Sequence, residues 1–272
     1  MSRPMWFVKL VRLGFPHRFL GARLTRLPLL GRLSDRMLFE GDELVILPPA
    51  AVLPVGEEVG GEEASAVLPD ELVHRLIDQA GFLWVMDSCI CRQATGCEDY
   101  PADLGCLFMG QAARDINPML GRRVSRDEAH AHIHHAREHG LFHLVGRNRL
   151  DTVWLGVGPG DHLLTVCNCC PCCCLWTMLP NLERGIGDKL ERLPGLKVEV
   201  TDRCLGCGTC VEGPCLAGAI SLEGGRAVIS EACRGCGHCA HVCPEGAIEV
   251  TLPGGGYVDE LVRRMSGLVD VR

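Results

Sequence analysis

Hydrophobic residues recur along this chain at two different spacings, which predict both helices and strands. Residues 72–77 repeat apolar side chains with the period of a helix, which we expect to start at Asp70 and to end at Gly81. The apolar run at residues 82–86 predicts a short strand directly after that helix. Residues 44–47 predict another strand inside an extended linker rich in Pro, Gly and Glu. The mixture indicates an α+β fold.

Three further elements are expected in the second half of the chain. Ser125 and Glu128 form a capping box, which opens a helix that we expect to end at Gly140. Residues 151–157 and 162–166 flank a Gly-Pro-Gly-Asp sequence and predict a β-hairpin. Apolar residues at positions 258, 261, 262, 265 and 268 share one face of a C-terminal helix.

The helix expected over residues 125–140 is rich in histidine. At 100° per residue, Ala129, Ile133 and Ala136 share its buried face. The histidines fall on two flanks, namely His132, His135 and His139 on one and His130 and His134 on the other. Spacings of three and four residues suit a metal or proton-relay site. A solvated face on an ordinary helix explains the same residues more simply, and we favour it.

The first 36 residues are basic and amphipathic. They hold eight Lys and Arg against a single acid, Asp35, whereas the whole chain carries a net charge of −7. Gly and Pro residues cut the segment into short pieces, and leucines alternate with arginines. Such a segment can lie on an anionic membrane surface, or its leucines can pack on the body or on a partner subunit, which we favour. A transit peptide is a third and weaker reading.

The remainder of the chain is acidic, which makes nucleic acid an unsuitable partner. The sequence shows no secretory signal pattern and no run of 18 apolar residues. With 18 cysteines in metal-like spacings, we expect a reducing cytoplasm, that of an anaerobe, with possible attachment to a membrane surface. No Gly-rich phosphate loop follows a strand, so flavin, nicotinamide and ATP sites are not supported.

Two cysteine runs near the C-terminus dominate the candidate chemistry. The second run has the C-x2-C-x2-C-x3-C-P spacing of bacterial iron–sulfur proteins, and the first has one extra residue before its fourth cysteine. Because the fourth cysteine of each run ligates the other cluster, two [4Fe–4S] clusters are expected. Their ligands are Cys204, Cys207, Cys210 and Cys243 for one cluster, and Cys233, Cys236, Cys239 and Cys215 for the other. A pair of zinc sites is the weaker alternative.

Ten cysteines remain, in two groups. Cys89, Cys91, Cys97 and Cys106 lie in a Gly/Pro-containing loop after the strand at 82–86 and suit one more cluster, with Arg92 as a donor to its sulfurs, or a structural zinc. The six others crowd into eight residues, Cys167, Cys169, Cys170, Cys172, Cys173 and Cys174. Adjacent residues in an extended chain point opposite ways, so these six should divide between two faces. We expect them to ligate a further cluster, to remain reactive thiols or to form a metallothionein-like clasp.

Residues 196–252 resemble a bacterial dicluster ferredoxin, through the two runs just described. Residues 70–252 also resemble uncharacterised multi-cluster 4Fe–4S binding proteins of anaerobes, through Cys89-Ile-Cys91-Arg92 and through the Cys167–Cys174 stretch. The resemblance implies cluster binding and redox work, with no defined substrate.

We therefore expect a Cys-rich N-terminal α/β region with a C-terminal dicluster ferredoxin module. The expected divisions are residues 1–69 (basic segment and linker), 70–194 (Cys-rich domain), 195–252 (ferredoxin) and 253–272 (C-terminal helix). The expected function is electron transfer at low potential to or from a redox partner protein, through two [4Fe–4S] clusters and one or two more. The alternatives are an iron–sulfur oxidoreductase acting on a disulfide or other sulfur compound at Cys167–Cys174, and a metal-binding scaffold without redox function.

Overall fold

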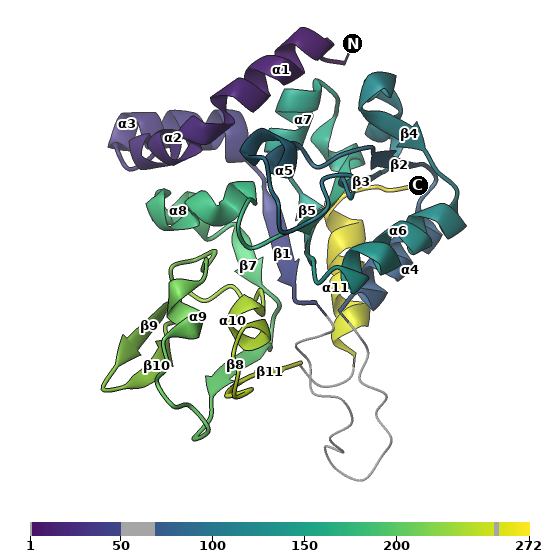
Figure 1. Cartoon of the computed structure of the whole chain (residues 1–272). Coiled ribbons are helices and arrows are strands. Elements are labelled where there is room, and N and C mark those ends of the chain that lie inside the picture. The colour runs from purple at the N-terminus through teal and green to yellow at the C-terminus, as the bar shows by residue number, and fades with distance from the viewer. Residues whose placement is uncertain (1, 50–68, 253–255) are drawn as a thin grey trace.

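A seven-stranded mixed sheet forms the centre of the body (Figure 1). The computed structural model describes residues 2–49, 69–252 and 256–272. The strands lie in the order β4-β2-β3-β6-β5-β1-β7, and only β1 and β7 pair in parallel. Their bounds are β1 Glu43–Leu47, β2 Leu83–Met86, β3 Leu107–Met109, β4 Gly121–Arg123, β5 Phe142–Arg147, β6 Leu164–Cys169 and β7 Leu190–Arg192.

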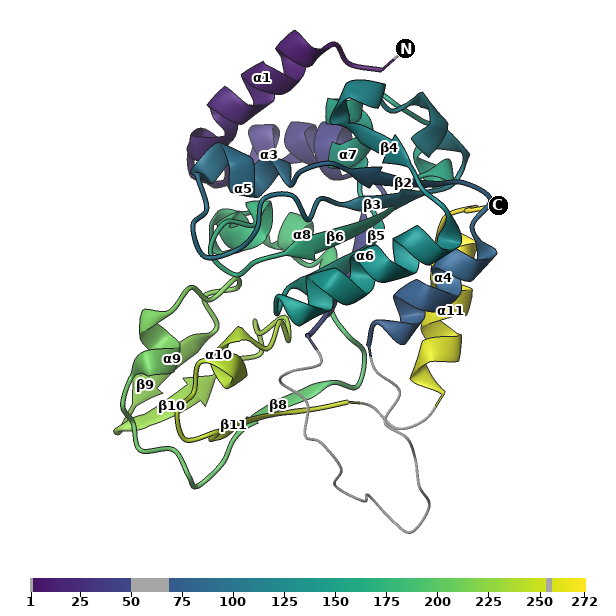
Figure 2. The same ribbon diagram turned by 45° about the vertical axis from the view of Figure 1, so that its right-hand side comes forward.

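Alternate residues of each strand enter different cores, because successive side chains of a strand point to opposite faces. Val45 and Leu47 of β1 join one core, whereas Leu44 and Ile46 join the other. Three helices cover the first face (Figure 2), namely α4 (Glu71–Gln79), α6 (Arg126–Glu138) and α11 (Tyr257–Leu268). The predicted helix at residues 70–81 and the capping box of Ser125 and Glu128 are both confirmed.

Short helices and loops cover the opposite face, together with the N-terminal segment (Figure 2). They include α5 (Ile90–Thr95), α7 (Arg149–Leu155), α8 (Arg184–Gly187) and the 3-10 helices η4 (Gln111–Asp115), η5 (Pro118–Leu120), η6 (Gly160–His162) and η7 (Leu175–Asn181). All the cysteines outside residues 195–252, a segment that we call the ferredoxin module after its expected identity, lie on or beside these elements and the ends of β3 and β6. This face therefore carries the candidate chemistry.

The N-terminal segment is a string of short helices, as its Gly and Pro residues predict. These are α1 (Met5–Gly14), η1 (Phe15–His17), α2 (Arg18–Leu24), α3 (Pro28–Ser34) and the π-helical turn η2 (Asp35–Phe39). The segment packs through a few buried residues, among them Val8, Phe15 and Phe39. The Arg3 amide donates to the Leu155 carbonyl at 2.8 Å, which ties the start of the segment to α7. Many of the segment's large apolar residues, such as Leu13 and Leu29, remain exposed.

The ferredoxin module is a smaller unit beside the sheet, built from two antiparallel strand pairs and two short helices (Figure 1). Strand β8 (Lys197–Val200) pairs with β11 (Ile248–Thr251), and β9 (Ile220–Glu223) pairs with β10 (Arg226–Ile229). Helices α9 (Thr209–Glu212) and α10 (His238–His241) each carry the third cysteine of a run. A β-hairpin thus lies between the two cysteine runs, and a strand follows the second run.

The expectation of a β-hairpin over residues 151–166 is wrong. Residues 149–155 form helix α7, not the first strand of a hairpin, because Leu150 and Trp154 share one face at helical spacing and Gly156 ends the helix in the left-handed conformation. Strand β6 instead pairs with β5. The sequence pattern does not predict β5, because this strand directly follows the histidine-rich helix.

Segments on both sides of the expected division at residue 70 pack against one another. Strand β1 lies between β5 and β7, and helix α11 packs in the same core as α4 and α6. Residues on both sides of the expected boundary therefore build one core.

Candidate metal centres

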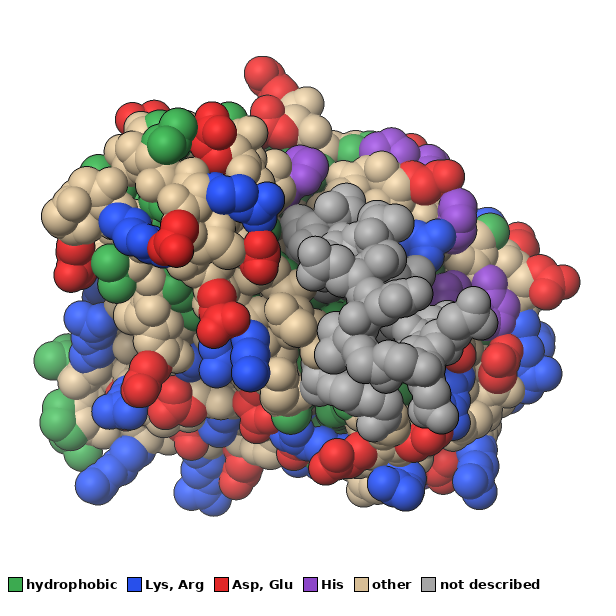
Figure 3. All heavy atoms as spheres, turned by 90° about the horizontal axis from the view of Figure 1, so that it is seen from below, with side chains coloured by type: hydrophobic (Ala, Val, Ile, Leu, Met, Phe, Trp, Pro, Cys, Tyr) green, Lys and Arg blue, Asp and Glu red, His purple; other side chains and the backbone are tan. Residues whose placement is uncertain are grey.

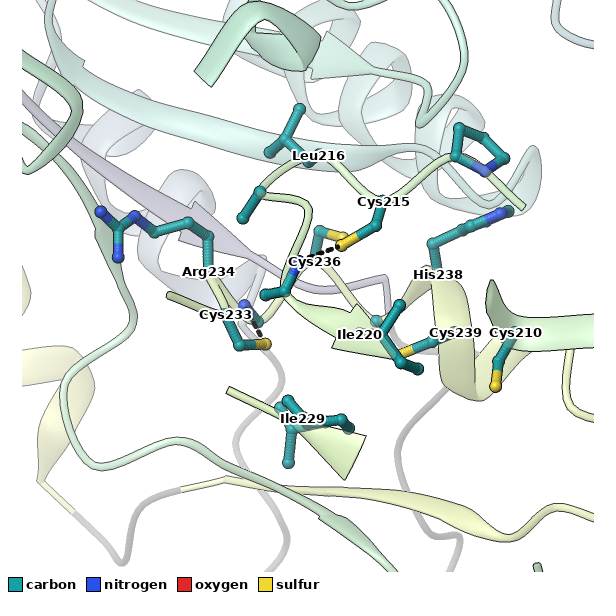
Figure 4. A pocket seen from close by; sticks show the side chains of 16 residues that line it. Cys210, Cys215, Leu216, Ile220, Ile229, Cys233, Arg234, Cys236, His238 and Cys239 are labelled. Atoms are coloured by element: carbon teal, nitrogen blue, oxygen red, sulfur yellow. Dashed lines mark hydrogen bonds between the residues drawn. The ribbon is translucent and has the colours of Figure 1, made fainter. Parts of the chain in front are cut away.

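The eight cysteines of the ferredoxin module form two groups of four, each beside its own pocket. Cys215 lies with Cys233, Cys236 and Cys239 around a pocket of about 30 Å³, which Cys210 of the other group also lines (Figure 4). The other four, Cys204, Cys207, Cys210 and Cys243, line a pocket of about 10 Å³. In each group, one thiol comes from the other run, which is the exchange that the spacing predicts. Although the first run has an extra residue before Cys215, the Cys215 thiol still lies with Cys233, Cys236 and Cys239.

The backbone around these thiols fits a cluster with inorganic sulfurs. Gly206 has a φ of +68°, and a Cβ atom there would lie 1.9 Å from the Gly225 carbonyl oxygen. Only glycine therefore allows this close approach. Backbone amides also point at the thiols, since Gly235 N lies 3.4 Å from Cys233 Sγ and Ala219 N lies 3.2 Å from Cys215 Sγ. Amide donors of this kind stabilise thiolate ligands and tune the potential of a cluster.

Burial keeps several of these thiols protonated in the absence of metal. It raises the pKa of Cys236 and the pKa of Cys239 to about 12 each. Metal binding must then displace these protons, because the thiolate is the ligand. Cluster loading is accordingly linked to pH and to folding of the module.

The ten other cysteines divide into a group of four and a group of six. Cys97, Cys170, Cys172 and Cys173 form the first, which we call the four-thiol group. All of their sulfurs lie within 4.8 Å of one another, and the Cys97 and Cys172 sulfurs are 3.8 Å apart. Two thiolates on one tetrahedral zinc, with bonds of about 2.3 Å, lie about 3.8 Å apart. The four-thiol group therefore fits a single tetrahedral zinc or iron ion.

The ferredoxin thiols provide an internal comparison. Within the part of the chain that the structure describes, no other set of three or more His, Cys, Asp and Glu residues is as tightly gathered as the four-thiol group. A cubane needs wider spacing, because each of its irons takes one thiolate. The four-thiol group therefore suits a single metal ion, whereas the two groups of the ferredoxin module suit cubanes.

The second group lines a cavity of about 260 Å³, which we call the six-thiol cavity. Its thiols belong to Cys89, Cys91, Cys106, Cys167, Cys169 and Cys174. Two sulfur pairs are close together, Cys106 with Cys167 at 3.3 Å and Cys169 with Cys174 at 3.4 Å. Cys170 of the four-thiol group also lines this cavity, so the two sites are neighbours.

The four cysteines expected to share one site after β2 are thus divided. Cys97 belongs to the four-thiol group, and Cys89, Cys91 and Cys106 line the six-thiol cavity. Helix α5 begins directly after Cys89 and ends at Gly96, whose left-handed conformation turns the chain. Cys97 leaves the far end of this helix and meets Cys172, while Cys91 stays at the six-thiol cavity. The sequence suggested a loop here, and the helix is the reason for the different grouping. The expected division of the Cys167–Cys174 stretch into two sets agrees with the structure, since three of its thiols lie at each site.

Arg92 lies between these sites and has no exposed surface. Its guanidinium donates to the Asn168 carbonyl at 2.8 Å and to the Leu104 carbonyl, which joins the segments that carry Cys106 and Cys169. Burial opposes its charge, but the neighbouring Cys89, Cys170 and Cys169 thiolates raise the pKa of Arg92 above its ordinary value. The arginine is therefore a fixed cation beside the thiols, in keeping with the role expected for it.

The histidine-rich helix contributes one residue to this region. Two side chains approach the Gly105 carbonyl, which directly precedes Cys106: His132 Nε2 at 2.9 Å and Asn168 Nδ2, which donates at 2.8 Å. Asn168 Oδ1 also bonds to His143, and burial lowers the pKa of His143 to about 4. The solvated face expected for the helix histidines therefore does not describe His132, and periodicity alone gives no signal for Asn168 or His143.

Asp151 of α7 is the acidic residue of the cavity wall. It accepts hydrogen bonds from Thr165 at 2.9 Å and from Trp154 at 2.8 Å. Burial, helped by the negative charge of Cys167, raises the pKa of Asp151 to about 7. A proton can therefore reside at this carboxyl near neutral pH. The sequence pattern predicts a strand at residues 151–157 and therefore does not reveal this role of Asp151.

Comparison with protein families bears on the C-terminal module alone. A model of the 4Fe-4S binding domain matches residues 227–249, which contain the complete second cysteine run. The chain therefore contains an iron–sulfur module that binds at least one [4Fe–4S] cluster. No curated protein and no solved structure matches the chain. Across the described residues, no helix is long and apolar enough to cross a bilayer.

Proposed function

We propose that this protein transfers electrons at low potential between a redox partner protein and the thiol-bound centres of its N-terminal domain, with the ferredoxin module as the entry or exit point. Two [4Fe–4S] clusters would occupy the ferredoxin module, and the four-thiol group and six-thiol cavity would hold further centres. The expected setting is a reducing compartment, in keeping with eighteen cysteines that are all free.

The observation that supports a relay is the continuous placement of the sites. Pro214 and His238 line the pocket of the Cys215 cluster site. The same two residues share a surface depression with Tyr100 and Cys172 of the four-thiol region. Cys170 then connects the four-thiol group to the six-thiol cavity, since it belongs to one and lines the other. Electrons that enter at the ferredoxin module thus have a sequence of neighbouring centres to follow.

The test is anaerobic loading of the full chain with iron and sulfide, followed by potentiometric EPR and visible spectra. We expect broad iron–sulfur absorbance that bleaches with dithionite and more than two redox-active centres. The matched variant is Cys236→Ser, which removes a ligand of the Cys215 site, compared with the wild-type chain. Partner-mediated reduction of the middle centres should slow in the variant, while dithionite should still reduce them. A colourless protein that holds zinc alone would overturn the proposal and favour a scaffold without redox function.

A reductase is the second candidate function, and the six-thiol cavity is the observation that favours it. Apolar and aromatic side chains, such as Leu144, Trp154 and Trp176, line this cavity beside the thiols, and its volume exceeds that of either ferredoxin pocket. A disulfide or another sulfur compound is the substrate class to test, with reduced ferredoxin module as the electron source. Turnover with a chemical reductant that disappears in Cys167→Ser would support this function, and electron transfer without turnover would reject it.

A further inference from the structure

The six-thiol cavity differs from the two cubane pockets of the same chain in size. It measures about 260 Å³, against about 30 Å³ for the pocket at Cys215 and about 10 Å³ for the pocket at Cys204. The ferredoxin pockets show how much room this fold leaves among thiols that suit a cubane. The six-thiol cavity leaves several times more volume among its thiols.

The number and arrangement of its thiols also differ. A cubane takes four thiolates, one on each iron, whereas this cavity offers six in addition to Cys170 of the four-thiol group. Two pairs are separated by 3.3 and 3.4 Å, close to the roughly 3.8 Å expected for two thiolates on one tetrahedral metal. The described part of the ferredoxin module has no sulfur pair recorded at such a distance. The pairs therefore suit irons that each take two thiolates.

Unpaired polar atoms point to an occupant of this cavity. Six buried side-chain nitrogen and oxygen atoms lack a hydrogen-bond partner within the described residues, and three of them belong to residues that line it. These three are Arg18 Nε, Arg92 Nε and Asn148 Oδ1. Arg234 Nε has the same status beside the cubane site at Cys215. Two buried arginine donors suit the sulfide ions of an anionic cluster.

We propose that the six-thiol cavity binds a polynuclear iron–sulfur centre larger than one cubane, held by Cys89, Cys91, Cys106, Cys167, Cys169 and Cys174. Arg18 and Arg92 offset the negative charge of the centre and donate to its sulfides. Soft thiolate donors select iron–sulfur, zinc or copper(I), and the ferredoxin module on the same chain favours iron. This inference deepens the proposed function by naming the centre at the inner end of the relay.

The test counts iron, sulfide and zinc in the full chain loaded anaerobically. Two cubanes account for about eight irons and the four-thiol group for one more ion, so a third centre larger than a cubane requires more than about thirteen metal ions per chain. The double variant Cys106→Ser/Cys167→Ser should lose more than four irons and keep the EPR signals of the ferredoxin module. Cys172→Ser, at the four-thiol group, is the matched control and should lose a single metal ion.

A loss of four irons or fewer from the double variant would overturn the proposal, as would zinc or copper at this site. A second measurement guards against a variant that does not fold. The Mössbauer spectrum of the wild-type chain loaded with iron-57 should contain a component distinct from cubane iron, and cubane components alone would also overturn the proposal. Absence of the ferredoxin signals from the loaded wild-type chain would instead contradict the proposed function, so the two failures are distinguishable.

A second and independent observation concerns the outer side of the N-terminal segment. Large apolar side chains there are exposed at helical spacing, such as Trp6, Leu10 and Leu13 on α1, where Leu13 is 75% exposed. The pattern continues through α2 and α3, with Leu20, Leu24, Leu27, Leu29, Leu30, Leu33 and Met37. Exposed apolar surface of this extent marks an interaction site.

Cations flank this apolar stripe. Lys9, Arg12, Arg32 and Arg36 are exposed, and none of their side chains has a recorded hydrogen bond or ion pair among the described residues. The segment's single acid, Asp35, is already paired with Lys189. In contrast, the face seen from below in Figure 3 shows acidic and basic side chains interspersed. Basic residues beside an apolar face suit an anionic lipid surface, where leucines enter the acyl boundary and cations meet the head groups.

We infer that the outer face of residues 3–37 docks on an anionic bilayer. The inner face of the same segment supplies Val11, Phe15 and Arg18 to the wall of the six-thiol cavity. Docking therefore places the cavity next to the membrane surface.

The test is cosedimentation of the metal-loaded full chain with vesicles of phosphatidylcholine alone and with 30% phosphatidylglycerol. We expect binding to the anionic vesicles that weakens with salt, and at least a tenfold loss in Leu13→Glu/Leu29→Glu. Met119→Glu is the matched control, since Met119 is also 71% exposed but lies outside the segment. Equal binding by all three proteins, no binding at all, or a salt-independent dimer formed through the segment would each overturn this inference.

Discussion

Replacement of Arg92 by Met tests whether a buried cation organises the two thiol sites. The guanidinium is fully buried and donates to the carbonyls of Asn168 and Leu104. Met has a similar length and keeps the apolar packing of the stem, so the main loss is two charge-assisted hydrogen bonds.

The magnitude follows from the two carbonyls left without a partner. Each buried acceptor that loses its donor costs about 1–3 kcal/mol, so the free energy of unfolding should fall by roughly 2–6 kcal/mol. Removal of a buried charge relieves some desolvation, which opposes this loss. In the metal-loaded protein the positive charge faces anionic centres, so its removal adds to the destabilisation. The reduction potential of the centre in the six-thiol cavity should become more negative, because a reduced centre carries more negative charge.

The assay is anaerobic urea unfolding followed by circular dichroism, together with a potentiometric titration. Arg92→Lys keeps the charge but not both hydrogen bonds, so it should retain the potential and lose part of the stability. Arg75→Met is the control for charge removal at the surface, since Arg75 and Asp259 form an exposed pair and such pairs contribute about 0–1 kcal/mol. If Arg92→Met unfolds within about 0.5 kcal/mol of the wild type and keeps its potentials, the reasoning is refuted.

Three further results are expected. In Cys243→Ala, the cluster of the first run should be lost, which removes about four irons, while the cluster at the Cys215 site should remain. Iron analysis and EPR measure this loss. Loss of the second-run cluster alone would contradict the exchange of the fourth cysteine between the runs. In Cys172→Ser, metal analysis should show one ion fewer per chain, and a loss of four irons would show that the four-thiol group holds a cubane instead. Burial raises the pKa of Asp42 from 3.8 to about 6. Ionisation of this carboxyl therefore lowers the free energy of unfolding. The loss grows as the pH rises from about 4 to about 6 and stays constant above about pH 6. Asp42→Asn keeps the acceptor for the Arg149 amide and should be more stable than the wild type by up to about 3 kcal/mol above pH 6. Denaturation curves should converge below about pH 4, and a constant difference at every pH would contradict this assignment.

The sequence determined the features that depend on residues close together in the chain. Spacings of two and three residues keep thiols within reach of one cluster, so the two ferredoxin groups followed from the cysteine runs. The capping box of Ser125 and Glu128 fixed the start of α6, and Gly and Pro residues divided the N-terminal segment into short helices.

Only the tertiary structure decided how the ten other cysteines are shared. The register of β6 against β5 places Cys167 opposite Leu144 and Cys169 opposite Phe142, which fixes both thiols on one face of the sheet. Helix α5 carries Cys97 to Cys172, 75 residues later in the chain. Arg92 became a buried cation because Leu104 and Asn168 surround it from other segments. Contacts of this kind depend on strand pairing across long loops, and local spacing contains no information about that pairing.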